Sequence, residues 1–387
     1  MPTQSRDDNR SPPRAGEIDR RSLMPFVGAG AAFLMLPRIA QAQQNPIAKT
    51  PAEVAGRAPA GALVFAEEQT ISAKLMAADA VPRSNTEAGR RILTGTPTGG
   101  PVFKTFADFL GAVAARKIEP IDISPPVPDS ISANLDVVFQ KGDNYELGLN
   151  LFTPKDSDKV VPLVVMVHGG CWIDGGRADY NYYGVKLAQL GYAAATVDYR
   201  VADQARYPAA VDDVRNAIQW LKDHAKTYNI DPSRIALLGG SAGGHLVELI
   251  GYSANTPTKQ HPEGPGPKLK AIVAFYGWSD LTDPAVRDFY WDEAFLGKKY
   301  ADAPELYKEA SPITHVSKQS PPTILLQGTI DAVVPLSQSV KLAKALDAHN
   351  VPYVYAPFEG QFHAFDYFKD TTERSLYFIE KFLAEYL

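Results

Sequence analysis

Short apolar runs alternate with amphipathic segments from about residue 130 to the C-terminus. Continuous apolar runs such as 163–167 are typical of strands buried on both faces, whereas apolar residues spaced three and four apart, as in 209–225, indicate helices. Runs that predict strands lie at 135–139, 147–152, 163–167, 193–197, 235–238, 271–275, 323–326 and 353–357. Segments that predict helices lie at 183–190, 209–225, 242–250, 337–348 and 372–386. This alternation favours an α/β fold with a mainly parallel sheet covered by helices on both faces, and we expect the first two strands to pair antiparallel.

The first 126 residues have a different pattern. Residues 1–42 contain Arg20 and Arg21, an apolar run over 23–36 and a small-residue end at 40–42. This order predicts a twin-arginine signal peptide cleaved after Ala42, and hence a periplasmic or secreted bacterial protein. A permanent membrane anchor is the less favoured alternative, because the run is short and contains Pro25.

Residues 43–126 are rich in Ala, Pro and Thr, and only 105–116 has a clear helical period. We expect this N-terminal extension to pack on the surface of a catalytic domain over 127–387. An active-site cap is the alternative role.

Composition limits the function. The formal net charge is −5, and removal of the signal, with its six basic and four acidic residues, lowers it to −7. The mature chain therefore lacks the basic excess typical of nucleic-acid binding. A single cysteine, Cys171, excludes an internal disulfide. No Cys/His cluster has metal-ligand spacing and no phosphate-binding glycine motif follows a strand, so we predict no metal and no cofactor.

The stretch Gly239-Gly240-Ser241-Ala242-Gly243 carries the strongest chemical signal. It is a G-x-S-x-G sequence between a predicted strand and a predicted helix, which is the context of a nucleophile elbow. A sharp turn exposes the serine hydroxyl to a general base and crowds the positions two before and two after it, where only glycine fits. A Ser/Gly loop is the alternative reading of the motif alone, but the flanking strand and helix favour a catalytic Ser241.

Two later strand ends supply partners for this serine. Asp331 follows the strand over 323–326, and His363 follows the last strand. Catalytic groups of such sheets gather at the carboxyl ends of strands, and the order Ser, Asp, His is the one used by elbow enzymes. Asp331 could instead form a turn, and His363 could be an ordinary loop histidine. Asp366 is an alternative acid that ranks below Asp331 because it lies so close to His363 in sequence.

The stretch His168-Gly169-Gly170-Cys171-Trp172 follows another buried strand. Glycines let backbone N–H groups approach the oxygen that becomes negative when serine attacks a carbonyl. We predict an oxyanion hole from the N–H groups of Gly170, Cys171 and Ala242, with Gly169 as a further possible donor. His168 should brace this loop, and Cys171 should contribute its backbone and not a reactive thiol.

With these motifs, residues 130–387 resemble the α/β-hydrolase esterases of the hormone-sensitive-lipase-like and feruloyl-esterase-like (BD-FAE-type) branch, whose oxyanion motif reads His-Gly-Gly-x-Trp. The resemblance implies that Ser241 is the nucleophile, His363 the base and then the acid, and Asp331 the residue that orients His363. Many relatives have Gly or Ala where Cys171 stands and His where Gln327 stands. The segment before Pro126 matches nothing in the family pattern.

The resemblance implies hydrolysis of short-chain or aryl carboxylic esters through an acyl-enzyme. Two alternatives stay open: cleavage of amides by the same triad, as in an arylformamidase or peptidase, and a non-catalytic binding protein of the same fold. Aromatic residues near the expected site, Trp172 first among them, could contact a small-molecule ester. Activity should rise with pH as His363 loses its proton, because only neutral imidazole can accept the serine proton. The natural substrate and the oligomeric state are not encoded in a form that can be read.

Overall fold

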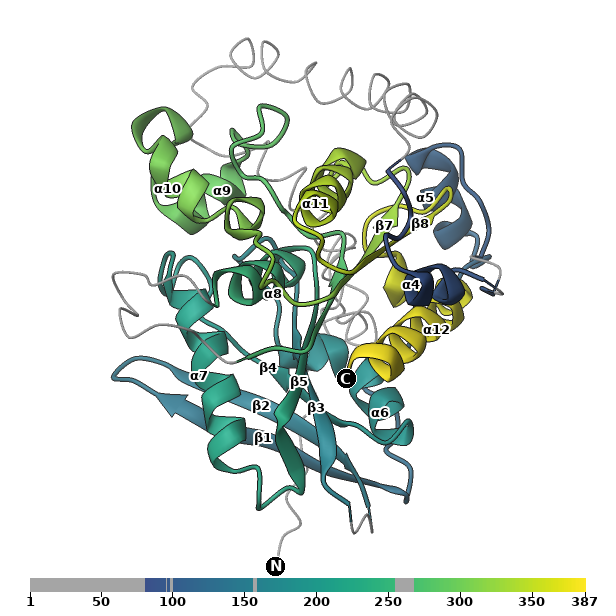
Figure 1. Ribbon diagram of the computed structural model, residues 1–387, viewed down its shortest axis with the longest axis vertical. Helices are drawn as coiled ribbons and strands as arrows, with labels where there is room; N and C mark the ends of the chain where they lie inside the picture. Colours follow the sequence, from purple (N-terminus) through teal and green to yellow (C-terminus); the bar gives the residue numbers. More distant parts are fainter. Residues whose placement is uncertain (1–80, 95, 98–99, 156–158, 255–267) are drawn as a thin grey trace, which may run out of the picture.

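The predicted mainly parallel sheet is confirmed. The computed structural model describes residues 81–387 except 95, 98–99, 156–158 and 255–267, so the predicted signal peptide lies outside the described residues. One sheet of eight strands has the order β1-β2-β4-β3-β5-β6-β7-β8 (Figure 1). Strands β3 to β8 pair in parallel, while β1 and β2 pair antiparallel with each other and β2 pairs antiparallel with β4.

The strands lie where the apolar runs predict them, and most extend a few residues further. Their bounds are β1 Ile131–Lys141, β2 Glu146–Pro154, β3 Val161–Val167, β4 Ala193–Val197, β5 Ile230–Gly240, β6 Ala271–Phe275, β7 Thr323–Gly328 and β8 Tyr353–Phe358. Every residue of β4, β6, β7 and β8 is buried. This burial explains why these strands read as continuous apolar runs and not as alternating ones.

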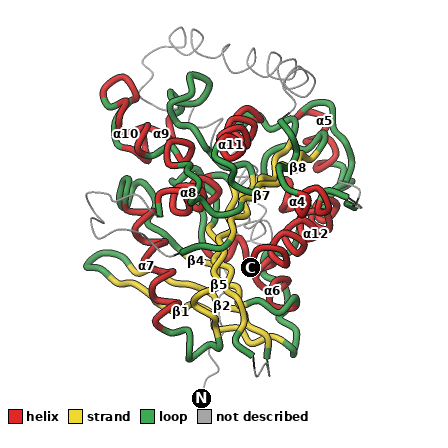
Figure 2. Tube along the Cα trace, in the orientation of Figure 1, coloured by secondary structure: helices red, strands yellow, loops and turns green. Residues whose placement is uncertain are grey.

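Helices cover both faces of the sheet (Figures 1 and 2). The predicted helices are α6 Asn181–Gln189, α7 Ala209–Asp223, α8 Ala242–Ser253, α11 Leu336–Ala348 and α12 Lys369–Tyr386. Helices α7 and α8 lie on one side of the strands, and α6 and α12 lie on the other. Sequence periodicity did not predict the short helices α4 Glu87–Ile92, α9 Tyr290–Leu296 and α10 Pro304–Glu309, because one or two turns give too few repeats to establish a period.

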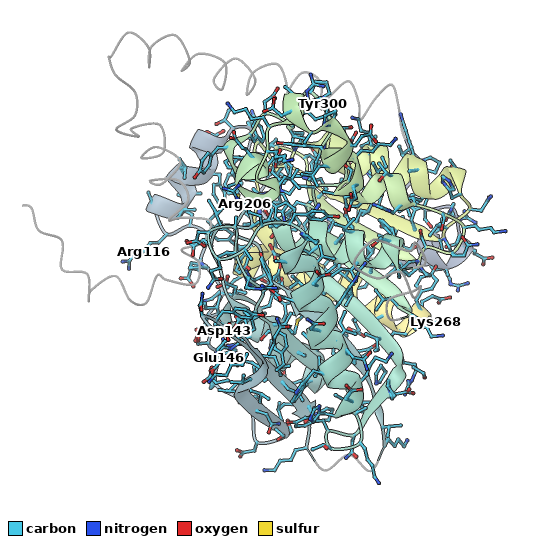
Figure 3. The ribbon with its side chains drawn as sticks, turned by 90° about the vertical axis from the view of Figure 1, so that its left-hand side faces the viewer. Arg116, Asp143, Glu146, Arg206, Lys268 and Tyr300 are labelled. Carbon is cyan, nitrogen blue, oxygen red and sulfur yellow. The ribbon has the colours of Figure 1, made fainter. Side chains whose placement is uncertain are left out.

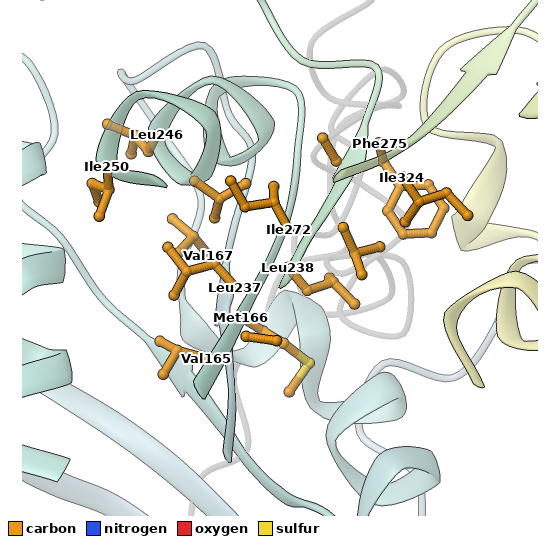
Figure 4. Close-up of a cluster of buried hydrophobic side chains, with 14 of the residues drawn as sticks. Val165, Met166, Val167, Leu237, Leu238, Leu246, Ile250, Ile272, Phe275 and Ile324 are labelled. Atoms are coloured by element: carbon orange, nitrogen blue, oxygen red, sulfur yellow. The ribbon is translucent and has the colours of Figure 1, made fainter. Parts of the chain in front are cut away.

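The centre of the core lies where α8 packs on β3, β5 and β6 (Figure 4). Apolar side chains such as Val167, Leu237 and Leu246 have no exposed surface. Charged side chains, among them Arg116 and Lys268, project from the periphery (Figure 3). The rigid centre therefore holds the strand ends in fixed positions, which matters for any site built on the loops that follow them.

The described part of the N-terminal extension lies along the β8 edge of the sheet (Figure 1). Ser84 forms a bridge with Val354 in β8, and Pro120 forms a bridge with Phe368 just before α12. Helix α5, Phe106–Ala114, begins with a capping box between Thr105 and Asp108. The described part of the extension therefore packs on the surface of the α/β unit. Within the described residues, no helix is both long and apolar enough to span a bilayer, and no group of three or more His, Cys, Asp or Glu side chains could hold a metal ion.

Candidate active site

Three predicted side chains meet at the carboxyl edge of the sheet. Ser241 follows β5, Asp331 follows β7 and His363 follows β8. The Ser241 hydroxyl oxygen lies 3.1 Å from Nε2 of His363, and Nδ1 of His363 lies 2.8 Å from Oδ2 of Asp331. With Nδ1–H donating to the carboxylate, Nε2 is left as an acceptor for the serine proton. The three groups form one hydrogen-bonded row, although 122 residues separate Ser241 from His363.

Ser241 has the strained backbone that an elbow requires, with φ 58° and ψ −121°. Such a conformation costs a non-glycine residue about 1–3 kcal/mol and persists only when the surroundings hold it. The two flanking glycines explain how the turn fits. A Cβ on Gly239 would lie 2.4 Å from the carbonyl oxygen of Gly243, and a Cβ on Gly243 would lie 2.0 Å from that of Val167. Helix α8 can approach β3 and β5 this closely only without side chains at both positions.

The carboxylate of Asp331 is fully buried and held by several donors. Oδ1 accepts from the backbone N–H groups of Val333 and Val334, each at 2.9 Å. Oδ2 accepts from Nε2 of Gln327 at 3.1 Å, in addition to His363. These donors aim the carboxylate at His363.

Gln327 is a functional neighbour that sequence reasoning noted only as a departure from the family pattern. Its amide nitrogen donates to Asp331, while its Oε1 accepts from the hydroxyl of Ser339 in α11 at 2.8 Å. Gln327 thus links the carboxylate to α11. The sequence signal for Gln327 was a polar residue near the end of a buried strand, where an apolar residue would be expected.

The glycine loop after β3 lies beside the elbow, because β3 pairs in parallel with β5 and Val167 is opposite Gly239. Gly170 has φ +114° and a Cβ there would lie 1.9 Å from the carbonyl oxygen of Asp174, so only glycine fits. A Cβ on Gly169 would lie 3.3 Å from the Cβ of Ser241, which places this loop against the serine. Ala242 begins α8, where the first N–H groups have no partner within the helix. The loop that carries the predicted donors Gly170 and Cys171 therefore lies against the serine at Gly169, and the third predicted donor, Ala242, follows the serine directly.

His168 stabilises this loop. Its ring stacks on Tyr199 with centroids 4.2 Å apart, and its Nδ1 lies 2.8 Å from the carbonyl oxygen of Gly169. The hydroxyl of Tyr199 donates to the carbonyl oxygen of His168 at 3.1 Å. These contacts fit the bracing role predicted for His168.

Cys171 and Trp172, which follow the glycines of this loop, are buried. Burial, followed by the nearby charge of Asp292, raises the pKa of the Cys171 thiol to about 12, which disfavours a reactive thiolate. Trp172 has no exposed surface; its ring stacks on Phe295 at 4.7 Å and meets His245 edge-on at 5.0 Å. Its position is that of a core residue, so we assign Trp172 a packing role in place of the predicted substrate contact.

The N-terminal extension also contacts the loops of the site. Phe109 in α5 packs against Phe362, next to His363, with centroids 5.8 Å apart, and edge-on against Phe368 at 5.4 Å. The N–H of Phe103 donates to the carbonyl oxygen of Gly360 at 3.1 Å, and Nε2 of Gln361 donates to that of Pro101 at 2.6 Å. The extension therefore supports the His363 loop from outside. This role is intermediate between the two that the sequence suggested, surface packing and an active-site cap.

Comparisons with known proteins show which sequences this chain is similar to. A protein-family model named BD-FAE matches residues 149–346, from β2 to α11. The esterase LipC of Mycobacterium tuberculosis is 34% identical over 237 residues, which are 58% of this chain and 58% of LipC. An ethyl acetate hydrolase of Pseudomonas putida is 29% identical over 251 residues, which are 62% of this chain and 76% of that protein. The matches to LipC, LipQ and LipM span between 50% and 58% of the length of those relatives.

Solved structures show the same arrangement of strands and helices. The thermophilic esterase Est2 of Thermogutta terrifontis superposes with a TM-score of 0.57 and 26% identity over 67% of this chain and 94% of Est2. A truncated carbohydrate esterase from gut microbiota superposes with a TM-score of 0.57 and 24% identity over 66% of this chain and 99% of that one, a likeness of fold.

Proposed function

Since the chain belongs to the BD-FAE family and has the α/β-hydrolase fold, we propose that it is a serine hydrolase that cleaves carboxylic esters through an acyl-enzyme. The observation that carries the proposal is the hydrogen-bonded row of Ser241, His363 and Asp331. Short-chain and aryl esters are the proposed substrates. The ethyl acetate hydrolase and the LipC esterase among its relatives support this class.

In the proposed mechanism, Oγ of Ser241 attacks the ester carbonyl carbon while Nε2 of His363 takes the serine proton. Asp331 holds the imidazole in the tautomer that can accept this proton and stabilises the imidazolium that forms. The carbonyl oxygen, now negative, accepts hydrogen bonds from the N–H groups of Gly170, Cys171 and Ala242. Donors already aimed at that point lower the barrier by roughly 3–4 kcal/mol each, because they need no reorganisation during the reaction.

The two halves of the reaction then mirror each other. His363 gives its proton to the leaving alcohol, which departs and leaves the acyl group on Ser241. Water enters, His363 takes one of its protons as the water attacks the acyl carbon, and the same oxyanion donors stabilise the second tetrahedral state. Breakdown returns the proton to Ser241 and releases the carboxylic acid.

The variant Ser241→Ala tests the proposal. Hydrolysis of p-nitrophenyl acetate should fall by about 10⁴-fold or more, and a fluorophosphonate probe should no longer label the protein. The matched control is Ser253→Ala, which removes another buried hydroxyl from α8, 12 residues beyond the nucleophile. Turnover retained by Ser241→Ala would remove the proposed nucleophile. A wild-type protein that cleaves formanilides far faster than esters would favour the amide alternative.

We also propose that the protein is exported, on the basis of Arg20-Arg21 and the apolar run after them. N-terminal sequencing of the protein purified from its host should begin at Gln43. An intact N-terminus in the soluble cytosolic fraction would refute export.

A further inference from the structure

We propose that Asp366 is a positioning residue for the His363 base, a second carboxylate that acts on the imidazole through the ring of Tyr276. This inference rests on the proposed function, because it concerns the same base. Asp366 lies three residues after His363, is fully buried, and the mechanism above does not use it.

Tyrosine hydroxyls from three elements converge on Asp366. The hydroxyl of Tyr276, just after β6, donates to Oδ1 of Asp366. The hydroxyl of Tyr180, at the end of the 3₁₀ turn Arg177–Tyr180, donates to Oδ2 at 3.4 Å, and that of Tyr183 in α6 donates to the backbone carbonyl oxygen at 2.8 Å. All three tyrosines are buried. Two hydroxyl donors to the carboxylate and a third to the backbone of the same residue hold Asp366 in one position.

Tyr276 joins Asp366 to the base. Its ring packs on the ring of His363 with centroids 4.5 Å apart, while its hydroxyl reaches the carboxylate on the other side. The backbone of Tyr276 is itself fixed, with φ +39° and an N–H that donates to the carbonyl oxygen of Leu326 at 2.8 Å. The hydrogen bond of its hydroxyl to Asp366 and that of its backbone N–H to Leu326 keep the Tyr276 ring from moving away from His363.

The same tyrosines lie beneath the nucleophile. A Cβ on Gly240, the residue before Ser241, would lie 2.4 Å from the hydroxyl of Tyr180 and 3.2 Å from that of Tyr276. The absence of a side chain at Gly240 lets these hydroxyls approach the elbow. The cluster therefore contacts the nucleophile turn and the His363 loop together.

The charges around His363 explain what Asp366 does. Burial raises the pKa of Asp366 to about 6, opposed by the hydrogen bond from Tyr276 and by attraction to His363. At neutral pH the carboxylate is therefore mainly ionised. Within the part of the chain that the structure describes, the titratable groups that face His363 or Asp366 are Asp331, Tyr180, Tyr183, Tyr276 and Tyr367, and none of these is a cation. The imidazolium that forms during catalysis thus has Asp331 at Nδ1 and a second negative charge across Tyr276, and both stabilise it.

The test compares Asp366→Asn, which keeps the shape and removes the charge, with Tyr276→Phe, which removes the link. The pH dependence of kcat/KM and the NMR titration of the His363 ring are measured for each. Asp366→Asn should lower kcat about tenfold with little change in KM, and should move both midpoints down by about half a unit to one unit. Tyr276→Phe should move them in the same direction by less.

Matched controls remove the same chemical groups elsewhere in the interior. Asp213→Asn removes the charge of a buried carboxylate in α7 that pairs with Arg200, and Tyr252→Phe removes a buried hydroxyl that bonds to Thr323. Both controls should leave the midpoints where the wild type has them.

Unchanged midpoints in a folded Asp366→Asn protein would overturn the inference and leave Asp366 a structural residue. If Asp366→Asn does not fold, Tyr276→Phe decides by the same readout. The NMR titration needs no turnover, so it separates this inference from the proposed function. A wild type without esterase activity whose His363 titration still moves in the variants would refute the proposed reaction and support the carboxylate effect.

Discussion

At the scale of single residues, the site depends on groups that hold the triad as much as on the triad itself. Asp331 can orient His363 only while its other lone pairs are occupied, and Gln327 supplies one of those donors from inside β7. An amide at this position does two things that an apolar residue could not, because it donates to Asp331 and accepts from Ser339. Gln327 thus supplies a donor to the carboxylate from within the sheet.

Replacement of Gln327 by Ala should lower kcat by roughly tenfold. A hydrogen bond to a charged group contributes about 1.5–3 kcal/mol, and without it the carboxylate of Asp331 is less firmly aimed. Steady-state kinetics on a short-chain ester measure the effect. Gln338→Ala is the control, because Gln338 is also buried but accepts from the backbone N–H groups of Ser279 and Asp280 and makes no bond to the triad that the structure gives. That variant should lose stability and keep its kcat; equal losses of kcat in both would contradict a specific role for Gln327.

At the scale of elements, the turn between β5 and α8 decides where the nucleophile stands. Three backbones meet there at distances that leave no space for a Cβ. Glycine at such positions is required by contact and not by local flexibility, which is why its replacement acts on the whole helix.

Replacement of Gly243 by Ala should push α8 away from β3, since the added Cβ would overlap the carbonyl oxygen of Val167. We expect a loss of about 1–3 kcal/mol in the free energy of unfolding and a much larger relative loss of activity, because Ser241 and the Ala242 N–H move together. Urea unfolding and ester kinetics test this. Gly111→Ala in α5, where a Cβ meets nothing within 4 Å, should be neutral or stabilising by up to about 1 kcal/mol. A Gly243→Ala enzyme with normal kcat would contradict the elbow geometry.

The packing of α5 on the His363 loop leads to a second expectation at this scale. Phe109→Ala should cost about 3–5 kcal/mol of stability and also lower kcat, because Phe362 loses its packing partner beside the base. Ile92→Ala in α4, a buried residue of the same extension that belongs to the main core, should reduce the thermal midpoint alone. A Phe109→Ala protein with unchanged kcat would reduce the extension to a surface support.

At the scale of the whole molecule, several ionisable groups lie in the core among apolar side chains. Burial raises the pKa of Glu248 to about 8 and lowers that of His245 to about 4. The folded protein therefore favours a protonated Glu248 and a neutral His245. Both groups make stability depend on pH, in opposite directions.

Glu248 should make the protein less stable as pH rises. Its pKa is 4.5 when unfolded and about 8 when folded, so the unfolded state releases the proton first and stability falls between pH 4.5 and 8, by an amount on the order of 5 kcal/mol. Glu248→Gln should remove most of that decline. Denaturant unfolding at pH 5, 7 and 9 measures it, and parallel declines in wild type and variant would show that Glu248 is not the cause.

The sequence by itself determined the features that a local pattern encodes, namely the strands, the longer helices and the nucleophile elbow. Buried parallel strands appear as continuous apolar runs. The elbow appears as glycines two residues before and two residues after Ser241, where close backbone contacts exclude any side chain. Chain order and strand ends were sufficient to select Ser241, Asp331 and His363, because parallel strands deliver their carboxyl ends to one edge.

Only the tertiary structure decided which residues surround these groups. Gln327 bonds to Asp331, Tyr276 lies between His363 and Asp366, Trp172 is buried in the core, and α5 supports the His363 loop. The Gln327–Asp331 bond spans four residues, but the other contacts join segments whose separation along the chain carries no periodic signal. They depend on the register and twist that bring particular side chains within a few ångströms. A linear pattern encodes the burial of a residue, whereas the identity of its neighbour is fixed only when the sheet is assembled.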